Sequence, residues 1–308
     1  MKPLVTVIGI AYNHASFIKE ALESLWAQTY ENLQVILLDD ASTDDSRQTI
    51  EELIGDREGI TFLPHEKNLG YTATFNEGLA LAKAEYIIDF ALDDVMLPEF
   101  IEKSVAALAS AGGEYGVSFT DAVYIDAGSV ETEQHYAQLK KKGLITTMPE
   151  GDIFEMVLKR YFICTPTMVI RKVVFDRLGG YDESLAYEDF DFWVRSSRYF
   201  RYVFTDEVLM KKRKLETSMS ANRYRHWENE QLSSVFKVCE KAFTLCKTKS
   251  ELKALRTRVA YEYRQALRSG HPELAIEHKE LYLRAGGSIV PLLLFKGLLR
   301  LGINPRRV

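Results

Sequence analysis

Pairs of acidic residues follow two apolar runs that are typical of buried strands. Asp39 and Asp40 end one such run, and Asp93 and Asp94 end the run Ile87–Leu92. In parallel α/β sheets the carboxyl ends of the strands lie along one edge, where ligands bind. Like charges gathered there are costly unless a cation or hydrogen bonds offset them. Carboxylate oxygens at a strand end suit Mg²⁺ or Mn²⁺ bound jointly with phosphate oxygens, so these pairs predict a divalent metal beside a phosphorylated ligand.

Polar residues at the neighbouring strand ends indicate that the phosphorylated ligand is a nucleotide. Tyr12 and Asn13 follow the first predicted strand, and Lys67 and Asn68 lie in a glycine-containing loop after the third. The Asp40 carboxylate can accept a hydrogen bond from the N3–H of uracil, and Tyr12 can pack against the base. Lys67 is placed to contact phosphate. We therefore expect a nucleotide with its phosphates at this edge.

Simpler explanations exist for each of these residues taken alone. Asp39 and Asp44 fit a strand terminus followed by a helix-capping turn. Asp93–Asp94 fits an exposed acidic turn, and Lys67 fits an ordinary solvated lysine. The residues by themselves leave these alternatives open.

The elements that must position this edge follow the alternation of a βαβ fold. Short β-branched runs alternate with helix-period segments through the first half, which favours an α/β fold with a mostly parallel sheet flanked by helices. From about Asn222 the chain changes to long, charged helical stretches. We predict an α/β domain over residues 1–220 and a helical extension over 221–308. The predicted strands are Val5–Ala11, Leu33–Leu38, Ile60–Leu63, Tyr86–Ala91, Gly116–Ile125, Thr167–Arg171 and Arg201–Thr205, and the predicted helices include Ser46–Ile54 and Thr72–Ala82.

The segment Asp126–Gly151 stands apart because it is polar and weakly patterned. Stretches of this length without regular structure are uncommon in compact domains, and many of them are functional loops. We predict a long loop that covers the active-site side as a lid.

The composition of the chain limits its class. It has 308 residues, 46% of them hydrophobic, and a formal net charge of −5. These values argue against a disordered chain and against a general nucleic-acid binder, so we expect no nucleic-acid partner. The three cysteines have no C-x-x-C spacing and are expected to be buried in a reducing compartment. Because Met1–Val5 leads directly into a strand pattern, we expect no signal peptide and a cytoplasmic location.

Six blocks in order resemble family 2 of the inverting glycosyltransferases, over roughly residues 4–220. The blocks are Val5–Asn13, Ser24–Tyr30, Val35–Asp45, Asn68–Gly70 with Asn76–Gly78, Asp93–Asp94, and Gly179–Glu183 with Glu188–Arg195. Any single block is unspecific, whereas their order and spacing together are specific. The resemblance implies a GT-A fold, a nucleotide-sugar donor, a sugar-hydroxyl acceptor, and Mn²⁺ or Mg²⁺ as the metal.

The resemblance also assigns site residues, with two departures from the family pattern. Ala11 stands where proline is usual, which alters the stiffness of the loop. Ala91 takes the first acidic place of the metal motif, which leaves Asp93 and Asp94 to serve the metal. We assign direct metal coordination to Asp94. The expected donor-binding residues are Ala11, Tyr12, Asn13, Asp40, Lys67, Asn68 and Asp93.

The basic segment Lys212–Leu215 is a third departure. Many family members carry a Tyr-Arg-x-His-like stretch here, and Leu215 holds the histidine position. No histidine contact with the diphosphate or the metal is therefore expected. Arg213 and Lys214 remain candidates for a phosphate contact.

The acidic pair Glu188–Asp189 matches the catalytic position of the family. By resemblance Asp189 is the general base, which takes the proton of the acceptor hydroxyl as that oxygen attacks the anomeric carbon. Attack opposite the diphosphate inverts the anomeric centre. The alternative is that Asp189 is an acid at a helix N-terminus, favoured by the helix dipole, and the two roles are compatible.

These residues predict an inverting, metal-dependent hexosyl- or N-acetylhexosaminyltransferase. UDP is the favoured nucleotide, with dTDP and GDP left open, and the acceptor is a glycan or a lipid-linked molecule of a cell-envelope polysaccharide. A Rossmann oxidoreductase is disfavoured because no G-x-G-x-x-G follows the first strand, and a nucleotidyltransferase would need a glycine-rich loop after Ile10. A glycoside hydrolase would need two carboxylates but no nucleotide pocket. A catalytically inactive sugar-binding or assembly subunit stays as the alternative.

The tail, residues 288–308, is apolar and basic. Its leucine, isoleucine and phenylalanine residues alternate with Lys296 and Arg300, and no acid interrupts them. Such a segment can lie at an anionic membrane surface, which would make the protein peripheral to the inner face of the membrane. Docking of the tail onto the protein itself is an equal alternative, and Pro291 and Gly297 weaken any long helix.

Overall fold

The computed structural model describes residues 2–215 and 230–301, which form two compact units. The first unit is built from Met1–Asp152, Phe162–Glu183 and Tyr199–Leu215, and the second from Ile153–Tyr161, Ser184–Arg198 and Glu216–Val308. The segments that contain α6 and α8 thus fold with the C-terminal helices. The division into domains at residue 220 stays a prediction.

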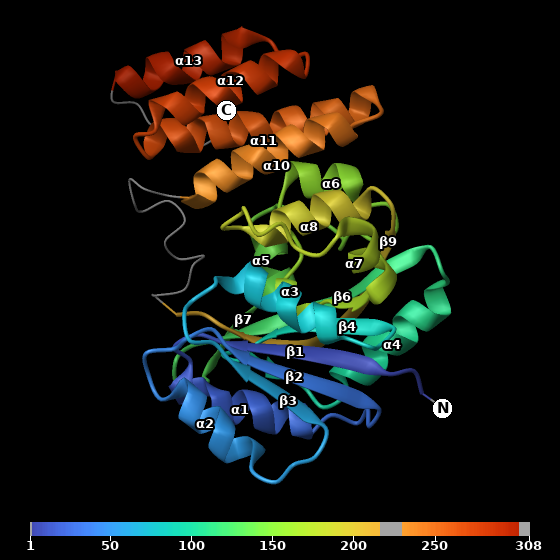
Figure 1. Ribbon diagram of the computed structural model, residues 1–308. Coiled ribbons are helices and arrows are strands. Elements are labelled where there is room, and N and C mark those ends of the chain that lie inside the picture. Colours follow the sequence, from blue (N-terminus) through green and yellow to red (C-terminus); the bar gives the residue numbers. More distant parts are fainter. Residues whose placement is uncertain (1, 216–229, 302–308) are drawn as a thin grey trace. The chain divides into compact units, whose positions relative to one another are not determined.

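The first unit is organised by a mixed, mostly parallel sheet (Figure 1). Among the described residues the strand order is β3-β2-β1-β4-β8-β6-β9-β5, and β7 pairs with β6. The pairs β2–β3, β1–β2, β1–β4 and β6–β9 are parallel, whereas β8 lies antiparallel between β4 and β6. The strands are β1 Val5–Ala11, β2 Leu33–Asp39, β3 Ile60–Pro64, β4 Tyr86–Ala91, β5 Val95–Met96, β6 Tyr115–Ile125, β7 Glu131–Gln134, β8 Val169–Arg171 and β9 Arg201–Arg213.

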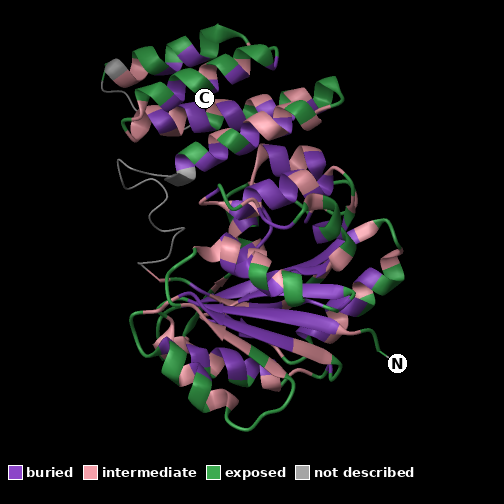
Figure 2. Cartoon of the chain, viewed as in Figure 1, coloured by how far each residue is buried: buried purple, intermediate pink, exposed green. Residues whose placement is uncertain are grey.

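The central strand β1 is buried along its whole length, which explains its continuous apolar sequence (Figure 2). Val5 and Val7 belong to a core that also contains Ile18 and Leu22 of helix α1. Ile8, whose side chain points to the other face, lies against Gly78 of α3, where an added Cβ would meet its Cγ2 at 2.6 Å. Helices therefore cover both faces of the sheet, as the βαβ pattern predicts.

The predicted strands agree closely with the observed ones, and two differences are informative. The last strand extends eight residues beyond the predicted Thr205, to Arg213, because it pairs along β6 as far as Ile125. The predicted lid, Asp126–Gly151, contains the strand β7 and the helix α5 and is not a plain loop. The helices of this unit are α1 Ala15–Trp26, α2 Ser46–Ile54, α3 Tyr71–Leu81, α4 Phe100–Ala111, α5 His135–Lys141 and α7 Lys172–Leu178, with a 3₁₀ turn at Thr165–Thr167.

The second unit is helical, as expected for the C-terminal region. Ion pairs join its segments: Asp191 of α8 accepts from Lys241 of α10 at 2.7 Å, and Arg198 pairs with Glu251 of α11 at 2.7 Å. Within residues 2–215 and 230–301, no helix is long and apolar enough to cross a membrane. The helices of the second unit are α6 Phe154–Lys159, α8 Glu188–Ser197, α10 Glu230–Leu245, α11 Lys249–Arg268, α12 Pro272–Arg284 and α13 Ile289–Arg300.

Two of the sequence blocks, more than 100 residues apart, are held together by one side chain. The Asn76 amide on α3 donates to the Tyr181 carbonyl and accepts from the Tyr181 N–H, both at 2.9 Å. Gly180 has φ +82°, and a Cβ on it would lie 2.5 Å from Asn76 Oδ1. Tyr181 also donates through its hydroxyl to Asp89 of β4. Glycine is thus required at position 180 both by its left-handed backbone and by the close approach of Asn76.

The neighbouring glycines 179 and 180 provide a matched test of this contact. Both have positive φ, but nothing lies within 4 Å of a Cβ on Gly179. Alanine at either position should cost about 1–2 kcal/mol for the left-handed backbone. Gly180→Ala should lose about 1–3 kcal/mol more, because it displaces Asn76. Urea unfolding of both variants measures this difference, and equal losses would show that the Asn76 contact is not restrictive.

Candidate active site

The loops that follow β1 and β2 meet at the carboxyl edge of the sheet. Asn13 Oδ1 accepts from the Thr43 N–H at 2.8 Å, and the Asn13 N–H donates to Ser42 Oγ at 2.9 Å. Asn13 and Ala41 have φ values of 57° and 56°, which is uncommon for residues other than glycine. Strained backbone of this kind persists only where surrounding contacts fix it, and it gathers at functional sites.

Asp40 anchors a third loop to this edge. Its carboxylate is buried and accepts from the N–H groups of Leu69 at 2.8 Å and Gly70 at 2.9 Å. The Asn68 amide donates to the Asp40 carbonyl at 3.1 Å. The loop after β3 is therefore joined to the end of β2 through one carboxylate. A contact between Asp40 and the base of a nucleotide stays a prediction, and the observed contacts support a role in holding the loop.

His65 belongs to the same cluster and was not singled out from the sequence. Its Nδ1 lies 2.9 Å from Asp40 Oδ1, and its Nε2 lies 3.1 Å from Glu77 Oε2 on α3. A neutral imidazole donates from one nitrogen only, so the imidazolium is the form that donates to both carboxylates. Its position directly after β3 is the one feature of the sequence that could have pointed to His65, because its partners are distant in the sequence.

The other acids of this edge bear out the capping alternative. Asp39 is buried and accepts from the Ser42 N–H and hydroxyl, at 3.0 and 2.5 Å. Asp44 accepts from the N–H of Ser46, the first residue of α2, and from that of Ala15, the first residue of α1, both at 3.0 Å. Burial opposes ionisation of Asp44, but a hydrogen bond from the Ser46 hydroxyl, together with those from the two N–H groups, prevails and lowers the pKa of Asp44. Both acids therefore stabilise the loops and helix ends around the site.

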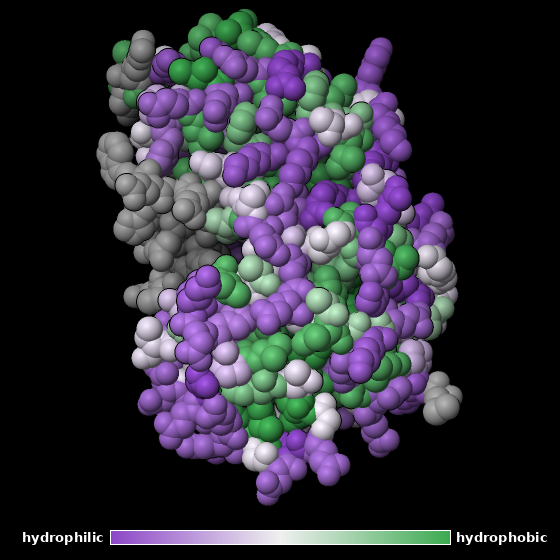
Figure 3. Space-filling view, viewed as in Figure 1, coloured by the Kyte–Doolittle hydropathy of each residue, from purple (hydrophilic) through white to green (hydrophobic). Residues whose placement is uncertain are grey.

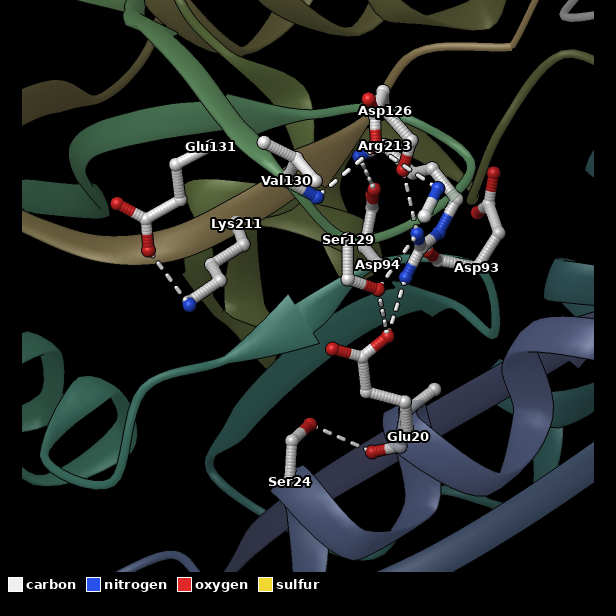
Figure 4. A network of polar contacts seen from close by, with 12 residues as sticks. Glu20, Ser24, Asp93, Asp94, Asp126, Ser129, Val130, Glu131, Lys211 and Arg213 are labelled. Atoms are coloured by element: carbon white, nitrogen blue, oxygen red, sulfur yellow. Dashed lines mark hydrogen bonds and ion pairs between the residues drawn. The ribbon is translucent and has the colours of Figure 1, made fainter.

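Asp93 and Asp94 differ in the burial and in the hydrogen-bond partners of their carboxylates (Figure 4). Asp94 is only 3% exposed, and its Oδ1 accepts from the Arg213 N–H at 2.8 Å. Burial and the adjacent Asp93 charge raise the pKa of Asp94 to about 7. Asp93 is half-buried, and its side chain points away from the Arg213 guanidinium. The more accessible carboxylate of the pair is thus Asp93, and the assignment of the metal to Asp94 stays a prediction.

Arg213 lies at the centre of a network of hydrogen bonds. Its side chain is 0% exposed. The guanidinium donates to the carbonyls of Asp93 and Asp126, both at 2.8 Å, and to Glu20 Oε2 at 2.6 Å (Figure 4). It also donates to the Ser129 hydroxyl at 3.1 Å. Four hydrogen bonds to the protein argue against the predicted phosphate contact by Arg213, which stays a prediction.

The remaining predicted residues of the first unit stand at the surface or at the strand ends. Lys67 is exposed, and Tyr12 is 46% exposed. Lys214 is exposed too, with its ammonium 3.1 Å from the centre of the Tyr124 ring. Ala11 is buried, and its carbonyl accepts from the Asp40 N–H at 2.9 Å. Tyr12, Lys67 and Lys214 can therefore reach a ligand without a change of fold.

Asp189 belongs to the second unit and occupies the first turn of α8. It is half-buried, whereas the preceding Glu188 is 8% exposed. A carboxylate in the first turn is stabilised by the helix dipole. Of the two acids, Asp189 has the greater access to solvent.

Within the described residues, no group of three or more His, Cys, Asp or Glu side chains is arranged to hold a metal ion. The acidic pair at the end of β4 contributes two carboxylates. Burial raises the pKa of Asp94 most, and repulsion by Asp93 raises it further; a divalent cation would relieve that repulsion. The chemistry of this pair fits a hard metal ion.

Comparison with known proteins identifies the family. The model of glycosyl transferase family 2 matches residues 6–179. An uncharacterized glycosyltransferase of Rickettsia prowazekii is 31% identical over 217 residues, which are 68% of this chain and 64% of that protein. The chain belongs to glycosyl transferase family 2. Another relative in the family, an uncharacterized glycosyltransferase of Haemophilus influenzae, is 30% identical over 76% of this chain and 72% of its own length.

Solved structures show that this family 2 chain has a GT-A fold. Staphylococcus aureus TarS (residues 1–349, in complex with UDP-GlcNAc) aligns with a TM-score of 0.70 at 16% identity, covering 91% of this chain and 81% of TarS. The mannosyltransferase PcManGT of Pyrobaculum calidifontis, in complex with GDP-Man and Mn²⁺, aligns with a TM-score of 0.65 at 17% identity. That alignment covers 97% of this chain and 80% of PcManGT. The predicted GT-A fold with C-terminal helices is confirmed.

The loop held by Asp40 gives a testable prediction for this family 2 chain. In Asp40→Asn an amide NH₂ faces N–H donors, so at least one hydrogen bond to a charged acceptor, worth about 1.5–3 kcal/mol, is lost. Amide hydrogen exchange at Leu69 and Gly70 should become roughly tenfold faster or more, as measured by mass spectrometry. Asp45→Asn is the control, because that exposed residue makes no side-chain cap hydrogen bond. Unchanged exchange in the Asp40 variant would contradict the anchoring role.

Proposed function

We propose that this chain is an inverting glycosyltransferase that moves a hexosyl or N-acetylhexosaminyl group from a nucleoside-diphosphate donor to an acceptor hydroxyl. The observation that carries the proposal is the edge where the loops after β1, β2 and β3 are joined through Asn13 and Asp40. The acidic pair follows β4, which is paired directly with β1. Ligands of open α/β sheets bind at this edge. The two solved structures with nucleotide sugars share this fold and support the proposal.

The donor side of the proposed site is formed by the first unit. Tyr12 exposes an aromatic ring that can pack against the base, and Lys67 exposes an ammonium that can pair with phosphate. We favour a UDP-sugar, with dTDP and GDP donors as the alternatives to test. Lys214 is the remaining candidate for a phosphate contact from the end of β9. The proposed acceptor is a glycan or a lipid-linked molecule, in polysaccharide biosynthesis of a cell envelope.

We propose that Asp93 would hold a divalent ion, Mn²⁺ or Mg²⁺, together with oxygens of the donor diphosphate. Such an ion supplies Lewis-acid stabilisation of the leaving diphosphate when bound. Asp94 does not bind the ion in this proposal. Its carboxylate accepts a hydrogen bond from the Arg213 N–H and thereby fixes the turn that carries Asp93. The guanidinium of Arg213 donates to the Asp93 carbonyl and holds the same turn.

We propose Asp189 as the general base. A sugar hydroxyl is a weak nucleophile, and a positioned carboxylate can accept its proton during attack. The half-buried position of Asp189 at the start of α8 supports this role over Glu188, which is buried. Attack on the face opposite the diphosphate gives inversion.

The alternative is an inactive sugar-binding or assembly subunit. It would bind a nucleotide sugar without releasing the nucleoside diphosphate. The deciding measurement is nucleotide release from UDP-sugars in the presence of Mn²⁺ and a panel of glycan acceptors. Absence of release with every UDP-, dTDP- and GDP-sugar would favour the inactive subunit.

The metal assignment predicts opposite outcomes for the two neighbouring acids. Asp93→Asn should weaken Mn²⁺-dependent UDP binding by roughly tenfold or more, because a ligating carboxylate becomes a neutral amide. Asp94→Asn keeps an oxygen for the Arg213 N–H and should leave metal-dependent affinity within about threefold of the wild type. Calorimetric titration with and without Mn²⁺ measures both. If only the Asp94 variant loses affinity, the metal belongs to Asp94.

The catalytic assignment predicts a loss of rate without a loss of donor affinity. Asp189→Asn keeps the size of the side chain but removes the basic site, so transfer should slow by about 10²–10⁴-fold. Glu188→Gln is the control and should retain most of the rate. If Asp189 acted only as a helix-end acid, the amide would cost about 0.3–1 kcal/mol of stability and spare the rate. A Glu188 variant without activity beside an active Asp189 variant would move the base by one residue.

A further inference from the structure

The terminal helix α13 docks through one face only. Leu292 and Phe295 are 2% and 3% exposed and belong to a small core with Tyr263 and Leu274 of α11 and α12. The Arg268 guanidinium lies 5.2 Å from the centre of the Phe295 ring. The docking alternative for the tail is thus confirmed for this face of the helix.

The opposite side of α13 is apolar and exposed. We call it the outer face, and define it as Ile289, Val290, Leu293, Leu294 and Leu301, which are 38%, 57%, 53%, 61% and 75% exposed. At about 3.6 residues per turn these positions fall on the side of the helix away from Leu292 and Phe295. In the space-filling view, hydrophobic side chains gather over the helices α12 and α13 (Figure 3). A contiguous apolar patch of this kind marks an interaction surface.

The charges in the sequence of the tail indicate the kind of partner. The segment 285–308 contains Lys296, Arg300, Arg306 and Arg307 and no acidic residue, although the chain as a whole carries a net charge of −5. Lys296 is exposed on α13 itself. An apolar helix face that lies beside Lys296, in a tail sequence without acidic residues, fits the interface of an anionic bilayer, where each nearby cation adds to binding. A second copy of the chain fits less well, because a self-complementary contact would bring two basic segments together.

We propose that the outer face of α13 docks onto the surface of an anionic lipid bilayer. The helix has 12 residues, whereas a spanning helix needs about 20, so it lies in the plane of the interface. The leucines enter the boundary of headgroups and acyl chains, and Lys296 pairs with lipid phosphates. This surface is independent of the proposed transfer reaction and brings the protein to lipid-linked molecules.

The test is flotation of the full-length protein with vesicles of phosphatidylcholine alone or with about 30% phosphatidylglycerol. The wild type should float with the anionic vesicles and be released by high salt. Leu293→Gln combined with Leu294→Gln should reduce the bound fraction by roughly tenfold or more, because two exposed leucines no longer enter the membrane. Ile276→Gln is the matched control, since Ile276 is 49% exposed on α12 and lies outside the outer face.

Three outcomes would overturn the proposal. The wild type could fail to float with either vesicle type, or the leucine variant could float as well as the wild type. Light scattering could also show a dimer that the leucine substitutions dissociate, without any flotation, which would assign the outer face to a second copy. Both leucines are exposed, so the variant is expected to fold, and circular dichroism checks this.

Discussion

The buried guanidinium of Arg213 determines how the end of the sheet is closed. It lies at the end of β9 and donates to the turn after β4, to the turn after β6 and to Glu20 on α1. These partners are 120, 87 and 193 residues away in the sequence. The guanidinium also lies 4.5 Å from the centre of the Phe17 ring. A fully buried cation is stable only when its donors are satisfied, so these turns are held in one arrangement.

Buried carboxylates at the strand ends are stabilised in the same way as the buried guanidinium, by hydrogen bonds from distant or neighbouring backbone. Carboxylates at strand ends are buried, and each accepts a hydrogen bond from a backbone N–H group. Asp39, Asp40 and Asp94 take donors from Ser42, from Leu69 and Gly70, and from Arg213. These bonds fix the loops that carry the exposed Tyr12 and Lys67 and the half-buried Asp93. Buried acids thus hold the loops in place, and more accessible residues on the same loops can contact a ligand.

This division of tasks explains how far the arrangement of the site residues could be predicted from the sequence. The pattern of residues predicted that the residues after β1, β2 and β3 meet at one edge, and the structure joins them there, because strand ends in a parallel sheet are fixed by the alternation of apolar runs and helices. It did not show which residue of each pair is buried: Asp94 and Arg213 are buried, whereas Asp93 and Lys214 are more accessible. Burial of a charged side chain depends on partners from distant segments, and no local pattern reports them.

The sequence by itself determined the α/β class, most strand positions, the family resemblance and the basic, apolar character of the tail. Periodicity and strand propensity are local properties, so short windows suffice to predict them. Only the tertiary structure decided that β9 runs on to Arg213, that His65 joins Asp40 to Glu77, and that one face of α13 is covered while the other is exposed. Each of these outcomes depends on which long-range partners meet, and those partners are chosen by the packing of the whole chain.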